Sequence, residues 1–129
     1  MPDRLATIGA WAFNGAGNNI TISSLPKTIR DIGTGAFIGC ANLHITEFGL
    51  DANEVGYVEM SIGQTAFGSC GSNTVTSIYI KESVKIIRVN AFYMYGKGYP
   101  IIAYTSYLEN EKPQGWETKS ENGIALSAA

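Results

Sequence analysis

Charged side chains are scarce in this chain of 129 residues and make up 16% of it, against roughly 25% in a typical globular domain. Between Arg30 and Lys81 there is no lysine or arginine at all, although several carboxylates lie there. The net charge of −2 offers no basic surface to nucleic acid or to an acidic membrane. For the acidic stretch we favour a solvated face over a weak divalent-cation site, because its loops show no ordered spacing of oxygen ligands.

The side chains on which metal and catalytic sites depend are also few. Two cysteines and the single His44 fall short of the roughly four ligands of a zinc site. His44 lies in an expected strand, and no serine or acid stands out as its catalytic partner. The glycine-rich run 33–39 has one residue too many for a dinucleotide-binding turn. We therefore expect no catalytic residue, no metal and no cofactor. We also expect that the protein is not an enzyme.

Long apolar runs are missing as well. The longest are far too short to cross a bilayer, so we expect no membrane insertion. The N-terminal residues 1–4 lead directly into patterned sequence, without the apolar segment of a signal peptide.

One motif occurs four times in the chain. It has an isoleucine, then an alanine four residues later, and then a phenylalanine directly after the alanine. The four copies are Ile8–Phe13, Ile32–Phe37, Ile62–Phe67 and Ile87–Phe92. Their phenylalanines are 24, 30 and 25 residues apart. A period of this length is typical of a solenoid, in which each repeat stacks on the next.

Short runs of alternating apolar and polar residues follow the motifs and predict strands, as at 20–22, 43–45 and 78–80. We predict a mainly β solenoid of about four irregular coils, with brief helical or 3₁₀ turns around the Ala-Phe segments. The expected core is Leu5, Ile8, Ala12, Phe13, Ile29, Ile32, Ala36, Phe37, Ile62, Ala66, Phe67, Val84, Ile87, Ala91 and Phe92.

The consensus of the repeats is Ile-Gly-x-x-Ala-Phe-x-Gly-Cys-x-Asn-Leu, and residues 32–43 show it best. This pattern resembles the BspA-like class of leucine-rich repeat proteins over about residues 5–104. The segment Pro113-Gln114-Gly115-Trp116, with Asn122-Gly123 after it, is similar to an insert that often follows a repeat in that family. The fourth copy departs from the pattern, with Arg88 in place of glycine and 93–95 in place of the Gly-Cys turn.

On this basis residues 1–104 form the repeats, with coils at about 5–28, 29–56, 57–83 and 84–104. We expect residues 105–129 to form a C-terminal extension that could cap the last coil. The resemblance implies a secreted or cell-surface protein that binds a protein or a glycan in adhesion or recognition. The alternative is a structural or decoration component of a larger assembly, such as a phage virion, with copies of itself or another subunit as partner. The lack of an export signal in these residues and the uncapped first coil favour this alternative.

Aromatic residues gather late in the chain. They can form a partner-binding surface, since tyrosine and tryptophan are enriched at interface hot spots, or they can cap the open end of the core. We leave both interpretations open for Tyr79, Tyr93, Tyr95, Tyr99, Tyr104, Tyr107 and Trp116.

Cys40 and Cys70 occupy the same repeat position in adjacent coils. Stacked strands lie about 5 Å apart, which is within the Cα range of a disulfide. The alternative, which we favour, is two buried thiols that pack as small apolar groups.

Overall fold

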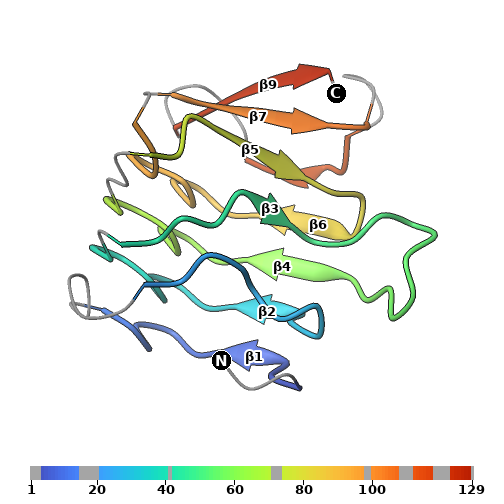
Figure 1. The fold of residues 1–129 in the computed structure, drawn as a ribbon, viewed down its shortest axis with the longest axis horizontal. Coiled ribbons are helices and arrows are strands. Elements are labelled where there is room, and N and C mark those ends of the chain that lie inside the picture. The colour runs from blue at the N-terminus through green and yellow to red at the C-terminus, as the bar shows by residue number, and fades with distance from the viewer. Residues whose placement is uncertain are drawn as a thin grey trace.

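The chain winds as a stack of parallel strands in the computed structural model, with its first and last strands at opposite ends of the stack (Figure 1). The structure describes residues 4–14, 21–40, 42–70, 74–97, 100–107, 112–117 and 123–128. Nine strands are present in these ranges, and no helix. The predicted mainly β solenoid is therefore confirmed.

Two sheets face each other across the core. The first has the order β1-β2-β4-β6-β8 and consists of β1 (Thr7–Ile8), β2 (Asp31–Ile32), β4 (Met60–Ile62), β6 (Val84–Ile87) and β8 (Gly115–Trp116). The second has the order β3-β5-β7-β9 and consists of β3 (Glu47–Phe48), β5 (Ser77–Ile80), β7 (Ile101–Thr105) and β9 (Ile124–Ala128). Successive coils add one strand to each sheet, and a parallel bridge between Ile22 and Leu43 links the first two coils beside β3.

The register of the first sheet follows the alignment of the repeats. Ile8 pairs with Ile32, Ile32 with Ile62, and Ile62 with Ile87. Trp116 continues this column opposite Ile87. All five side chains are buried, so the isoleucine column is one continuous strip of core.

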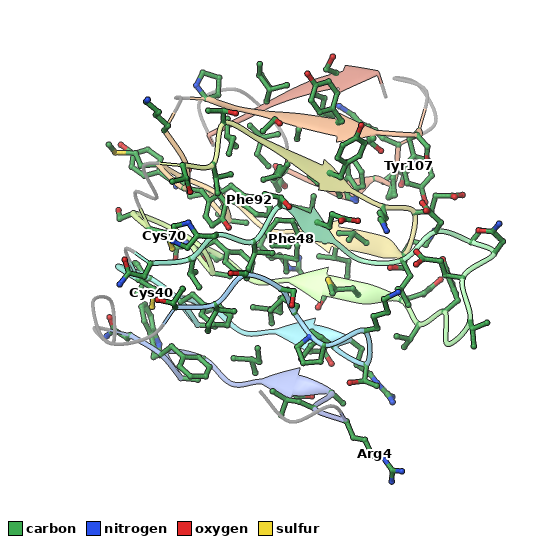
Figure 2. All side chains as sticks on the ribbon, in the orientation of Figure 1. Arg4, Cys40, Phe48, Cys70, Phe92 and Tyr107 are labelled. Carbon is green, nitrogen blue, oxygen red and sulfur yellow. The ribbon has the colours of Figure 1, made fainter. Side chains whose placement is uncertain are left out.

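The motif phenylalanines form a ladder along the stack. The ring centroids of Phe13 and Phe37 are 4.9 Å apart, those of Phe37 and Phe67 5.2 Å, and those of Phe67 and Phe92 5.4 Å. The planes of neighbouring rings differ by 5° to 8°. Phe48, on β3, meets Phe67 and Phe92 edge-on from the other sheet, and Figure 2 shows Phe48 and Phe92 inside the stack.

The Ala-Phe segments form hydrogen-bonded turns rather than the helical or 3₁₀ turns we expected. In the second coil the Ala36 amide bonds to the Gly33 carbonyl, and the Ile38 amide to the Gly35 carbonyl. The residue two before the phenylalanine has positive φ in every coil: Trp11 at 62°, Gly35 at 61°, Thr65 at 52° and Asn90 at 58°. Two turns sharing a left-handed residue cannot continue as a helix.

The expected core is buried with three exceptions, all in the first coil. Ala12 is exposed, and Leu5 and Phe13 are only partly buried. The prediction for these residues was wrong because, in the described part of the chain, another coil packs on only one side of them.

Two strands lie in the stretch 105–129 that we expected to form a C-terminal extension. β8 pairs with β6, and β9 pairs with β7 over five residue pairs. The Trp116 indole N–H donates to the Val84 carbonyl at 2.9 Å. This stretch therefore adds a layer to both sheets.

Candidate functional site

A groove runs along the solvent side of the second sheet, and we call it the sheet groove. Its volume is about 580 Å³. It is lined by Thr46, Glu47, Asp51, Ser77, Tyr79, Ile80, Lys81 and Ser106. Hydroxyl groups, two carboxylates, one ammonium group and one exposed aromatic ring thus share a single surface.

The alternation of the strands places these side chains outward. On β5, Ile78 and Ile80 are buried, whereas Tyr79 is 47% exposed. The register then puts Glu47 of β3 opposite Tyr79, and Tyr79 opposite Tyr104 of β7. A row of three outward residues, one from each strand, crosses the sheet.

The two tyrosines of this row pack against each other. The ring centroids of Tyr79 and Tyr104 are 5.4 Å apart, and the planes are tilted by 33°. Ile102, 44% exposed, lies opposite Ser77 and two residues before Tyr104. The strands therefore expose an aromatic and apolar patch to solvent at the edge of the groove.

Lys81 forms ion pairs with three carboxylates at the sheet groove. Its Nζ lies 3.0 Å from Glu47 Oε1, 3.4 Å from Glu54 Oε2 and 4.0 Å from Asp51 Oδ2. The hydrogen bond to Glu47, followed by the charges of Glu47, Glu54 and Asp51, raises the pKa of Lys81. Lys81, which follows the acidic stretch of the sequence, thus offsets part of the negative charge of that stretch.

Asp51 of the groove lining belongs to a long connection between β3 and β4, residues 49–59, which we call the insertion loop. The matching connection between β5 and β6 has only residues 81–83, and this difference accounts for the longer second repeat. Figure 1 shows the insertion loop projecting from the side of the stack. Val55 in this loop is 97% exposed. Insertions in repeat proteins often map to the binding face.

Glu54 fixes the base of the insertion loop. Its Oε2 accepts a hydrogen bond from the Asp51 amide at 2.6 Å. Its carboxylate also pairs with Lys27 and Lys81, each at 3.4 Å. The backbone hydrogen bond from Asp51, more than the two lysines, lowers the pKa of Glu54.

Acidification is expected to release this loop. A carboxylate with a lowered folded-state pKa stabilises the fold above its unfolded-state pKa, and that contribution is lost as the pH falls through the folded value. In an NMR titration the side-chain carboxyl carbon of Glu54 should shift with a midpoint below the ordinary glutamate value of 4.5, because the pKa of Glu54 is lowered. The Glu54→Gln variant serves as the control and should lose this transition. A midpoint at or above that ordinary value would contradict the assignment.

The seven late aromatic residues separate into two groups. Tyr79 lines the sheet groove, Tyr104 packs against Tyr79, and Tyr93 is 39% exposed beside the fourth Ala-Phe turn. Tyr99 lies outside the described residues. Tyr79, Tyr93 and Tyr104 are thus at least partly exposed, and one of them, Tyr79, lines the groove.

The other aromatic residues pack. Tyr95 is fully buried, and its hydroxyl donates to the Ile45 carbonyl at 2.6 Å; burial raises the pKa of Tyr95. The Tyr107 hydroxyl donates to the Glu82 carbonyl, and its ring meets Trp116 edge-on at 5.5 Å. Trp116 is 6% exposed. For Tyr95 and Trp116 the core-capping interpretation therefore fits, and neither offers a surface to a partner.

Cys40 and Cys70 are free, buried thiols in adjacent layers at one corner of the stack (Figure 2). The Cys40 thiol donates to the Phe13 carbonyl at 3.0 Å, and the Cys70 thiol to the Phe37 carbonyl at 3.2 Å. Burial raises the pKa of both thiols, that of Cys70 to about 12. These contacts match the packing interpretation.

Neither thiol is expected to react quickly in the folded protein, because the thiolate is the reactive form. With Ellman's reagent at pH 8, both cysteines should react only at the rate of unfolding. In denaturant both should react at once. Rapid modification of two thiols per chain without denaturant would contradict this expectation.

His44 and the acidic residues were the remaining candidates for a catalytic or metal site. His44 hydrogen-bonds through Nδ1 to the Thr74 hydroxyl at 2.7 Å. Across the residues the structure describes, no cluster of histidine, cysteine, aspartate and glutamate could hold a metal ion. In the same ranges no helix is long and apolar enough to span a membrane.

Comparison with known proteins adds one finding. A family model for a BspA type leucine rich repeat region matches residues 1–98 in six copies. No curated protein and no solved structure matches the chain.

Proposed function

Because the chain belongs to the BspA-type leucine-rich repeat family, we propose that it is a non-catalytic recognition module that binds a protein or glycan partner at the sheet groove. Repeats of this family generally mediate protein interactions. The cell-surface adhesion implied by the family is the setting we propose. The observation that carries the proposal is the row of Glu47, Tyr79 and Tyr104 held outward by three paired strands.

The row has the properties of an interface hot spot. Tyrosine gives a large contact area at low cost in conformational entropy. Its position on paired strands removes most of the remaining cost, since the backbone does not have to order on binding. The insertion loop adds Asp51 to the groove lining, and Glu54 holds the Asp51 amide in place.

The chemistry of the groove supports binding rather than catalysis. Its described lining contains hydroxyl groups but no histidine or cysteine that could act as base or nucleophile. Lys81 is held as an ammonium ion by three carboxylates, so it is a poor nucleophile.

The proposal is tested by binding to arrays of purified matrix proteins, surface glycoproteins and glycans, followed by affinity measurement on the hits. Saturable binding is expected, and Tyr79→Ala should weaken it about tenfold or more, as truncation of a hot-spot residue does. Tyr93→Ala is the matched control, because Tyr93 is similarly exposed and lies outside the groove lining. Binding that tolerates Tyr79→Ala, or no binding at all, would refute the proposal.

The first coil supports the second candidate, a structural component of a larger assembly. Trp11 is 52% exposed, and Phe13 ends the ring ladder with only one neighbour on it. A second copy or another subunit packed there would bury both. Light scattering over a wide concentration range should then show a defined oligomer that Trp11→Ser weakens. A mass of 13.8 kDa at every concentration would count against this candidate.

A further inference from the structure

We propose that the ligand of the sheet groove is a neutral oligosaccharide, with a sugar ring stacked on Tyr79, which packs against Tyr104, and with its hydroxyl groups bonded to Glu47, Asp51 and Lys81. This inference rests on the proposed function and names its ligand class. Four features of the groove support it.

The first feature is that β5, the strand that carries Tyr79, is not an edge strand of its sheet. β5 is paired on one side by β3 and on the other by β7. Its backbone groups are therefore already used, and a peptide cannot add to it as another strand. Recognition has to come from the outward side chains.

The second feature is the aromatic pair. The Tyr79 ring is about half exposed, and Tyr104 supports it at 5.4 Å. One face of a sugar ring is a flat layer of C–H groups, which binds an exposed aromatic surface by apolar contact.

The third feature is the charge balance. Glu47 and Asp51 carry two negative charges into the groove, and Lys81 carries one positive charge. The remaining net charge of −1 disfavours sulfated or other anionic glycans. A cationic peptide has to compete with Lys81 for the same carboxylates, which lie 3.0 and 4.0 Å from its Nζ.

The fourth feature is the supply of fixed donors and acceptors. Glu47 and Asp51 accept hydrogen bonds, Lys81 donates them, and the hydroxyl groups of Thr46, Ser77 and Ser106 do both. Neighbouring hydroxyl groups of a sugar suit this mixture, because each of them also donates and accepts. The volume of about 580 Å³ lies within the range of about 300–1,000 Å³ typical of small-molecule sites, so a few sugar units fill the groove.

The experiment is a titration of the ¹⁵N-labelled protein, followed by NMR, with four neutral probes: cellohexaose, maltohexaose, mannohexaose and fully N-acetylated chitohexaose. At least one is expected to shift the amides of β3, β5 and β7 in a saturable way. Tyr79→Ala and Tyr104→Ala should each weaken that binding about tenfold or more, and Tyr93→Ala should leave it unchanged. Thermal unfolding of each variant shows whether it is folded.

Two further probes, a heparin hexasaccharide and hexa-arginine, are titrated in parallel. Binding of either at the groove, with no response to the neutral sugars, overturns the inference. Binding of a neutral sugar that Tyr79→Ala does not weaken also overturns it. If all four neutral probes fail while an array protein still loses its affinity in Tyr79→Ala, the glycan inference falls and the proposed function stands. If no array protein binds either, both the glycan inference and the proposed function are refuted.

Discussion

Replacing Phe67 by alanine is expected to lower the free energy of unfolding by about 3–5 kcal/mol. Phe67 is fully buried between Phe37 at 5.2 Å and Phe92 at 5.4 Å, and Phe48 meets it edge-on at 5.1 Å. Removing this ring leaves a cavity that coils on both sides, held at a fixed spacing by their backbone bonds, cannot close. Since domains of this kind are stable by only about 5–15 kcal/mol, the loss is a large share of the total. Chemical denaturation followed by circular dichroism measures it.

Phe13→Ala is the control within the same ladder. Phe13 has one stacked neighbour, Phe37 at 4.9 Å, and its ring is only partly buried. Its removal opens a notch to solvent rather than an enclosed cavity, so we expect less than half the loss seen for Phe67→Ala. Equal losses for the two variants would show that ring stacking between coils is not the main source of stability.

The first sheet could be predicted from the sequence because its register repeats the sequence alignment. Each isoleucine of the motif lies opposite the isoleucine of the next copy, from Ile8 to Ile87. A stack of similar coils places equivalent residues above one another, so a column in the sequence becomes a column in space. The same reasoning accounts for the column of phenylalanines from Phe13 to Phe92, which were predicted as core residues.

Features that do not recur as a motif were missed. Trp116 continues the isoleucine column without any Ala-Phe segment after it, and Phe48 joins the core from the second sheet. The left-handed backbone two residues before each phenylalanine was missed because only Gly35 is a glycine there, whereas Thr65 and Asn90 adopt the same φ. Positive φ is uncommon for residues other than glycine, so it is difficult to predict from the sequence at these positions.

The candidate site was only partly predictable for a related reason. Tyr79 and Tyr104 were both among the predicted residues, but nothing in the sequence separated them from Tyr95, which is buried. A signal was present, since Tyr79 and Tyr104 are 25 residues apart, the same spacing as Phe67 and Phe92. Repeat spacing applied to outward residues identifies neighbours on the surface, as it identifies neighbours in the core.

Gly63→Ala is expected to be as disruptive as removing a ladder ring, for the opposite reason. A Cβ at Gly63 would lie 2.6 Å from the Gly33 carbonyl carbon, 2.7 Å from the Thr34 nitrogen and 2.8 Å from the Ile32 oxygen. These are backbone atoms of the preceding coil, and the 2.7 Å hydrogen bond from the Gly63 amide to the Ile32 carbonyl fixes the spacing. Neither side can move without breaking the ladder of bonds, so we expect a loss of about 3 kcal/mol or a failure to fold.

Gly9→Ala separates crowding between coils from any general effect of replacing glycine. Gly9 holds the same position in the motif, but nothing lies within 4 Å of a Cβ there. Its replacement should change the free energy of unfolding by no more than about 0.5 kcal/mol. Gly33→Ala, where a Cβ would lie 2.5 Å from the Ala10 nitrogen, should behave like Gly63→Ala. If Gly9→Ala proved as costly as the other two, the requirement for glycine would belong to the turn itself and not to the distance between stacked coils.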